Sequence, residues 1–134
     1  MVMAMIPRFR AWDKEFKEMV QVDALVFDEQ IIKATYKNGN VAKEDLKNYV
    51  LMQSTGLRDK NGKEIFEGDI LKVTNLSIWL EVVSFNKNKA MFVSKEVKRK
   101  VEETPLYDLF NTDIFEVEII GNIHTNPELA EISS

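Results

Sequence analysis

The sequence predicts a mainly β fold, and two features of the chain carry that prediction. Short apolar runs recur along the chain and are separated by turn-forming Asn, Asp and Gly residues. Within several runs apolar and polar residues alternate, most clearly where Phe115, Val117 and Ile119 alternate with Glu116 and Glu118. Such alternation is typical of a strand that buries one face and exposes the other.

Length and composition limit the classes of function. The 134 residues are close to the size of one domain, long enough to bury a core without disulfides or a structural metal. The formal net charge of −4 argues against a protein whose main task is gripping duplex DNA. The chain has no cysteine, so disulfides and thiolate chemistry are excluded. We recognise no targeting signal or membrane span and expect a cytoplasmic protein.

The N-terminal part, from about residue 6 to residue 53, is expected to consist of strands. The Asn38-Gly39 pair favours a tight hairpin turn between two of them. A helical turn is expected at Ala42–Asp45, directly before the last strand. The expected strands are a run around Phe9 and Ala11, then Met19–Phe27, Ile31–Tyr36 and Leu46–Gln53.

The segment from about residue 54 to residue 125 is expected to form a barrel-like core. Asp59 stands at the first position of a four-residue turn and Gly62 at the fourth, where a carboxylate caps and a glycine closes the turn. A second turn is expected at Glu67–Asp69. Gly121 is expected to mark a bend or bulge in the last strand. The expected strands are Ile65–Phe66, Asp69–Thr74, Ile78–Phe85, Ala90–Val93 and Phe115–Ile123.

Two short helical turns are expected, and one segment stays ambiguous. Thr104 is expected to cap a helix with Pro105 at its first position, and Asn126-Pro127 repeats this arrangement in a C-terminal turn over about 126–132. In the segment 95–103, valines at intervals of four fit a helix face and a strand face equally. Because valine dominates its apolar positions, we favour a strand.

The turn-rich segment holds a dense set of carboxylates, which are candidates for a chemical role. One interpretation is acid–base chemistry or a divalent cation site built from Asp59, Glu64, Glu67 and Asp69. The favoured interpretation is that this segment serves turn geometry, and that no cofactor, metal or catalytic constellation is present. Its predicted structural turn residues are Gly56, Asp59, Asn61, Gly62, Gly68 and Asp69. The single histidine, His124, is interpreted as an ordinary polar residue.

A basic cluster near the middle of the chain is the candidate binding surface. Aromatic rings beside basic side chains on a small barrel would suit single-stranded nucleic acid, whose bases stack on rings while cations follow the phosphates. The competing interpretation, which weighs more, places the rings in the core and the lysines on a solvated face. The candidate residues are Trp79, Phe92, Lys95, Lys98, Arg99 and Lys100.

Motifs spread over the chain carry a family resemblance. Leu51–Ile70 contains the runs LMQ, TGL, DKNG and EGDI, Phe9–Asp13 reads FRAWD, and residues 120–129 contain IGNI and NPEL. In these motifs the chain resembles the YopX family, which bacteriophages and prophages encode. Ser54 replaces the usual aromatic residue before TGL, and His124 stands where tyrosine is common. Residues 75–114, which include the basic cluster, show no family signature.

The resemblance implies an SH3-like, partly open small barrel with additional N-terminal strands, within a single YopX-like domain over residues 1–134. It also implies a phage or prophage origin, and it implies no activity. The leading hypothesis is a non-enzymatic accessory protein that binds a protein or single-stranded nucleic acid. The alternatives are a carboxylate-based hydrolase or metal-dependent enzyme, and an oligomeric assembly or morphogenesis subunit. The partner itself is not specified, and no membrane association is expected.

Overall fold

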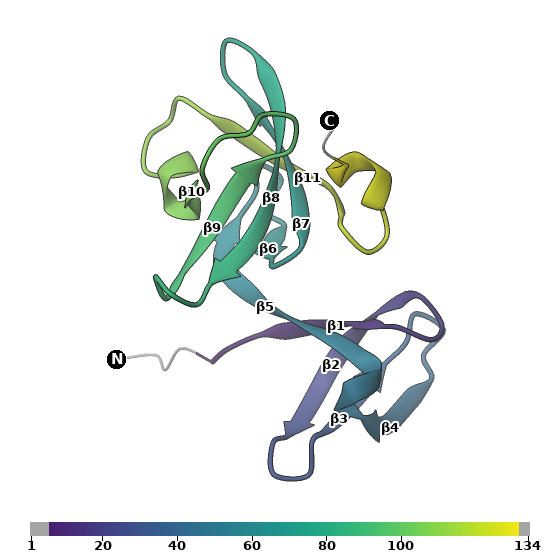
Figure 1. The fold of residues 1–134 in the computed structure, drawn as a ribbon. Helices are drawn as coiled ribbons and strands as arrows, with labels where there is room; N and C mark the ends of the chain where they lie inside the picture. The colour runs from purple at the N-terminus through teal and green to yellow at the C-terminus, as the bar shows by residue number, and fades with distance from the viewer. Residues whose placement is uncertain (1–5, 132–134) are drawn as a thin grey trace. The chain divides into compact units, whose positions relative to one another are not determined.

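The computed structural model describes residues 6–131. The outermost residues of the predicted domain, 1–5 and 132–134, lie outside this range, and with them the last residue of the predicted C-terminal turn. The described chain is mainly β with three short 3₁₀ turns, which confirms the predicted fold class (Figure 1). No helix within the described residues is long and apolar enough to cross a membrane.

The strands and turns follow the predicted order with several differences in their bounds. The elements are β1 (Phe9–Asp13), β2 (Glu18–Val26), β3 (Ile31–Thr35), β4 (Val41–Asp45), η1 (Leu46–Asn48), β5 (Tyr49–Arg58), β6 (Glu64–Phe66), β7 (Asp69–Thr74), β8 (Ile78–Asn86), β9 (Met91–Glu96), β10 (Thr104–Pro105), η2 (Leu106–Leu109), β11 (Glu116–Asn122) and η3 (Pro127–Ala130).

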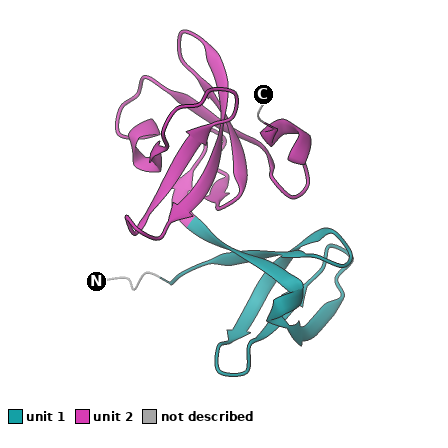
Figure 2. Ribbon diagram, in the orientation of Figure 1, with its two compact units in different colours: residues 1–54 teal, residues 55–134 magenta. Residues whose placement is uncertain are grey.

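The chain divides into two compact units, residues 1–54 and residues 55–134, coloured teal and magenta in Figure 2. The boundary falls within β5. Strands form two antiparallel sheets, one ordered β4-β3-β2-β1-β5-β6 and the other β10-β9-β8-β7-β11. The second sheet is open, and β10 and β11 are its edge strands.

The N-terminal unit has a small core, and a turn at Asn38-Gly39 joins two of its strands. The β3–β4 hairpin is closed by Gly39, whose φ of +88° confirms the predicted tight turn. The core beneath the strands consists of Ala11, Val20, Ile32, Ala34 and Tyr49.

A buried carboxylate, that of Asp13, accepts hydrogen bonds beside this core. Asp13 is 3% exposed, and its Oδ1 accepts the backbone amides of Glu15 and Phe16. Its Oδ2 accepts the hydroxyl of Tyr36, which lies 2.7 Å from the hydroxyl of Tyr49. Burial would raise the pKa of Asp13, but the hydrogen bonds outweigh burial and lower it. Burial and the bond to Asp13 raise the pKa of Tyr36.

Replacing Tyr36 with phenylalanine is expected to lower the free energy of unfolding by about 1–3 kcal/mol, because it leaves Asp13 and the Tyr49 hydroxyl without their shared partner. Urea denaturation followed by circular dichroism measures the change. Tyr107→Phe is the matched control, since that side chain is 63% exposed, and a change within about 0.5 kcal/mol is expected there. Equal stabilities of the two variants would contradict the role of the network.

The structure corrects the predicted helical turn at Ala42–Asp45. These residues form β4, paired with β3, and the 3₁₀ turn follows at Leu46–Asn48. The Asp45 carboxylate accepts the amide of Lys47 at 3.1 Å, so Asp45 begins the turn instead of ending it.

The segment after β9 also departs in part from the prediction. The expected strand over 95–103 ends at Glu96, and the chain then bends. Thr104 does not cap a helix, because Thr104 and Pro105 pair with Ser94 and Val93 as β10. The helical turn η2 starts one residue later, with Pro105 at its N-cap.

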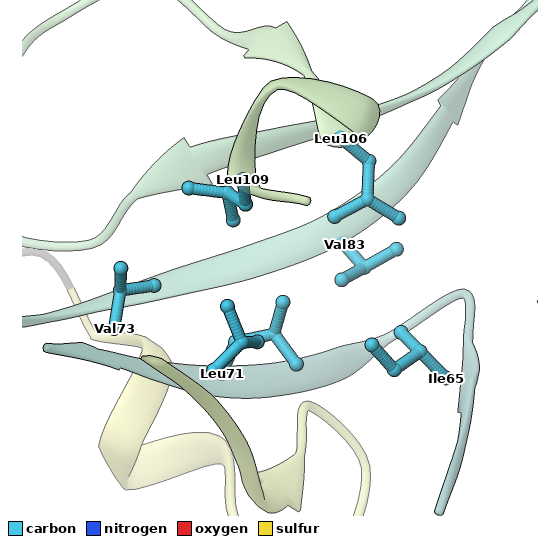
Figure 3. Close-up of a cluster of buried hydrophobic side chains, with 7 residues drawn as sticks. Ile65, Leu71, Val73, Val83, Leu106 and Leu109 are labelled. Carbon is cyan, nitrogen blue, oxygen red and sulfur yellow. The ribbon is translucent and has the colours of Figure 1, made fainter. Parts of the chain in front are cut away.

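In the C-terminal unit one face of the sheet is covered by η2. Leu106 and Leu109 extend from the turn toward the strands, where Figure 3 shows them beside Val83 and Leu71. The buried cluster consists of Ile65, Leu71, Val73, Val83, Leu106, Leu109 and Val117. Phe115 and Ile119 pack against it, which confirms the alternation predicted for the last strand.

The predicted bulge in β11 is present. The register between β11 and β7 shifts between Ile119 and Gly121. The side chain of Asn126 lies against Gly121, where a Cβ would come within 2.4 Å of its Oδ1. Asn126 therefore occupies the space that a Cβ at residue 121 would fill, and η3 begins with Pro127 directly after it, as predicted.

Candidate functional site

A groove of about 360 Å³ lies in the C-terminal unit. Strands β8 and β9 supply one part of its lining, and the segment after β9, β10, η2 and Phe115, directly before β11, supply the rest. Its lining residues are Trp79, Glu81, Ser94, Glu96, Arg99, Val101, Glu102, Thr104, Asp108, Leu109 and Phe115.

A buried glutamate lies in this groove. Glu81 is 5% exposed, although a charged side chain is rarely buried without partners. Its Oε2 accepts the indole N–H of Trp79 at 2.7 Å, and its Oε1 accepts the hydroxyl of Ser94 at 2.6 Å. Both donors are neutral, so these bonds solvate the carboxylate without cancelling its charge.

A second carboxylate lies directly opposite the first. Glu81 and Glu96 are cross-strand partners in the β8–β9 pair, and like charges in that position repel each other. Arg99 relieves the repulsion, because its Nε and Nη2 both donate to Glu96 Oε2, at 3.0 and 2.8 Å. The side chain of Glu96 is 15% exposed, whereas that of Arg99 is 72% exposed.

The charge of the groove is negative. Its lining includes the exposed carboxylates of Glu102 and Asp108 in addition to Glu81 and Glu96, and Arg99 is the cation among the lining residues. The aromatic wall is the pair Trp79 and Phe115, edge to face with ring centroids 6.0 Å apart. An acidic groove with an aromatic wall suits a positively charged ligand.

A smaller depression of about 210 Å³ shares part of this lining. Trp79, Glu96 and Arg99 border both, and the depression adds Ile78 and Lys98. Ile78 is 65% exposed. The two hollows therefore adjoin each other at these three residues.

The carboxylates of the turn segment have structural roles. Asp59 is 7% exposed; its Oδ1 accepts the amides of Asn61 and Lys63, and its Oδ2 accepts the amide of Ile119 at 3.0 Å. Burial would raise its pKa, but these three hydrogen bonds outweigh burial and lower it. Asp69, 1% exposed, likewise accepts a backbone amide.

Gly62 has a φ of +80° at the end of the Asp59 turn, a conformation that favours glycine. Glu64, the first residue of β6, and Glu67, directly after β6, are half-buried. Among residues 6–131, no three His, Cys, Asp or Glu side chains gather as metal ligands.

Comparison with known proteins identifies the family. The sequence matches the family described as YopX protein over residues 8–131. The chain belongs to the YopX family. A crystal structure of protein EF1440 from Enterococcus faecalis is similar, with a TM-score of 0.61 and 30% sequence identity, over 96% of this chain and 100% of that one. No curated protein matches the chain.

In this YopX family member, the predicted binding residues are only partly brought together. Trp79 and Arg99 line the groove, and Lys98 lines the adjoining depression. Phe92 instead packs against the core, edge to face with Phe85 at 5.2 Å. Lys95 and Lys100 are exposed and are not among the groove's lining residues.

Sequence reasoning missed the carboxylates of the groove. The available signal was the period of two in β8, where Trp79 and Val83 face the core and Glu81 occupies the position between them. A glutamate at a core-facing strand position is unusual enough to mark a site. Glu102 and Asp108 carried no such signal.

Proposed function

We propose that this YopX family protein is a non-enzymatic binding module, and that its acidic groove receives a positively charged segment of a protein partner. The main support for this proposal is the pair of opposed carboxylates, Glu81 and Glu96, beside the aromatic wall that includes Trp79. Charge complementarity of this kind favours basic partners and disfavours acidic ones.

The groove's chemistry supports a protein partner over single-stranded nucleic acid. Phosphates would meet the carboxylates of Glu96, Glu102 and Asp108, and like-charge contacts weaken association. The rings of Trp79 and Phe92 already contact other aromatic side chains and the core, which limits the area left for stacked bases. Lys95, Lys98 and Lys100 remain the features that favour nucleic acid, so an oligonucleotide is included in the test.

The enzymatic alternative draws little support from the turn segment. Each oxygen of Asp59 already accepts backbone amides, which leaves it poorly suited to exchange a proton or to hold a cation. The setting that we propose for binding is the cytoplasm of a bacterium that carries the phage or prophage. The resemblance to phage-encoded YopX proteins supports that setting.

The proposal predicts that the protein binds a fluorescein-labelled oligo-arginine or oligo-lysine peptide and binds oligo-glutamate and oligothymidylate much more weakly. Fluorescence anisotropy measures the affinities, and added salt should weaken them. The double variant Glu102→Gln, Asp108→Asn removes two exposed charges from the groove and is expected to reduce affinity by about three- to tenfold.

The matched control is Asp113→Asn with Glu128→Gln, which removes the same charge from exposed positions outside the groove. An equal loss in both double variants would show attraction to the whole protein and would overturn the groove as the site. Tighter binding of oligothymidylate than of the basic peptides would overturn the choice of partner class.

A further inference from the structure

The guanidinium of Arg99 already occupies part of the groove. It reaches Glu96 from three residues further along the chain, where the backbone bends after β9. Both of its donors point to the same oxygen, Oε2, at 3.0 and 2.8 Å. An arginine and a carboxylate pair best when two parallel hydrogen bonds use both oxygens. The internal pair therefore uses only part of the bonding capacity of Glu96.

This internal ion pair is easy to exchange. The side chain of Arg99 is 72% exposed, and exposed ion pairs contribute little stability because water screens them and the long side chain must be held in one conformation. The side chain of Glu96 is only 15% exposed. In this groove, the carboxylate acceptor of Glu96 is therefore mostly buried, whereas the guanidinium of Arg99 that pairs with it is largely solvated.

We propose that Glu96, Glu81 and Trp79 form a subsite for an arginine side chain of the partner, and that Arg99 holds this subsite until the partner displaces it. The inference rests on the proposed function and specifies the chemistry recognised at that groove. Arg99 is then a resident competitor, and its swing outward from the bend frees Glu96 for the incoming guanidinium.

The geometry favours arginine over lysine. A partner guanidinium approaching from solvent is free of the three-residue tether and can engage both oxygens of Glu96, which a point-like ammonium cannot do in the same planar way. The negative charge of Glu81, opposite Glu96 and 5% exposed, adds attraction in a poorly solvated position. The indole of Trp79 borders the same space, where a single planar cation needs less of its ring than a row of stacked bases would.

The test compares oligo-arginine binding to the wild-type protein, Arg99→Ala and Lys100→Ala. Arg99→Ala should bind about two- to fivefold more tightly, because the competitor is gone. Lys100 is next to Arg99 in sequence, but its side chain does not line the groove. Lys100→Ala removes the same charge, and its gain in affinity should be clearly smaller. Glu96→Gln should lose the preference for oligo-arginine over oligo-lysine, and adding Arg99→Ala to it should restore no affinity.

A local readout separates displacement from general electrostatics. The chain contains two tryptophans, and the indole N–H of Trp79 donates to Glu81 in the groove, whereas Trp12 lies on β1 in the other unit. In ¹H–¹⁵N spectra, oligo-arginine should shift the Trp79 indole resonance and leave that of Trp12 in place. Arg99→Ala should shift the same Trp79 resonance in the free protein.

The outcomes distinguish the two proposals. Equal gains in Arg99→Ala and Lys100→Ala, or weaker binding by Arg99→Ala, would overturn the displacement, while wild-type binding to basic peptides would still uphold the proposed function. If the wild-type protein binds no basic peptide, the proposed function fails, and the arginine subsite fails with it. Circular dichroism of each variant confirms that a change in affinity is not a loss of folding.

Discussion

Replacing Asp59 with alanine is expected to lower the free energy of unfolding by about 3–5 kcal/mol. The side chain is 7% exposed and accepts three backbone amides. Alanine would leave these donors without the carboxylate, and a poorly solvated donor without an acceptor costs about 1–3 kcal/mol. The cost is below the sum of three such terms, because neighbouring losses share relaxation.

The third of these bonds explains why the loss should affect the whole C-terminal unit. The amides of Asn61 and Lys63 belong to the turn itself, but that of Ile119 lies on β11, sixty residues further along the chain. The backbone amide of Lys60 also donates to Val117 on β11. Asp59 therefore fastens the turn to an edge strand of the sheet, and the turn sequence stabilises tertiary structure as well as local structure.

Urea denaturation of the variant and of Asp113→Ala checks this prediction. Asp113 is exposed in the segment before β11, so its replacement should change stability by no more than about 0.5 kcal/mol. Asp59→Asn keeps one carbonyl acceptor and should lie between wild type and Asp59→Ala. A loss below about 1 kcal/mol for Asp59→Ala would show that water replaces the carboxylate.

The lowered pKa of Asp59 gives the same carboxylate a signature in pH. An unfolded aspartate has a pKa of about 3.9, and the folded pKa of Asp59 lies below its ordinary value. Its contribution to stability is therefore fully present above the unfolded pKa and is lost as the pH falls through the folded pKa. Asp59→Asn should flatten this part of the stability profile, and an unchanged acid limb would contradict the assignment.

Leu106→Ala is expected to cost about 2–5 kcal/mol, the range for removing a fully buried leucine side chain. Leu106 is 1% exposed and belongs to the buried cluster of the C-terminal unit, which η2 closes from one side (Figure 3). A 3₁₀ turn of four residues has little stability of its own, so its position depends on this anchor. The cavity left behind should loosen η2 and the groove residue Asp108 that it carries.

The matched control is Tyr107→Ala in the same turn, where the side chain is 63% exposed and a change within about 0.5 kcal/mol is expected. Thermal unfolding measures both variants, and hydrogen exchange reports whether the η2 amides lose protection. If Tyr107→Ala destabilises as much as Leu106→Ala, the turn is sensitive to any truncation and the anchor is not the cause.

The local patterns of the chain predicted much of the fold. Alternation in β11, the Asn38-Gly39 hairpin and the bulge at Gly121 were each readable, because turn geometry and one-sided burial act over a few residues. The errors arose where pairing decided between conformations. Ala42–Asp45 pairs with β3, and Thr104-Pro105 pairs with β9. In both segments, pairing with a neighbouring strand outweighed the local signals for a helix.

The candidate site was less readable than the fold. Trp79 and Arg99 were predicted as binding residues, but the predicted chemistry was basic, whereas the groove that contains them is acidic. The difference arises because Glu81 and Glu96 stand fifteen positions apart in sequence and become neighbours only through the β8–β9 register. The prediction of a basic surface relied on Lys95 and Lys100, which lie near Arg99 in sequence but do not line the groove.

By itself the sequence determined the β class and the turns around Asp59, because both depend on residues close together in the chain, and it determined the family through short motifs spread along the chain. Only the tertiary structure decided what those residues do. It showed that Asp59 holds β11 as well as its own turn, and that Arg99 is paired to Glu96 beside a buried Glu81. Burial and cross-strand neighbours determine how strongly a charged group interacts with its surroundings. Both follow from the register of strands that are distant in sequence.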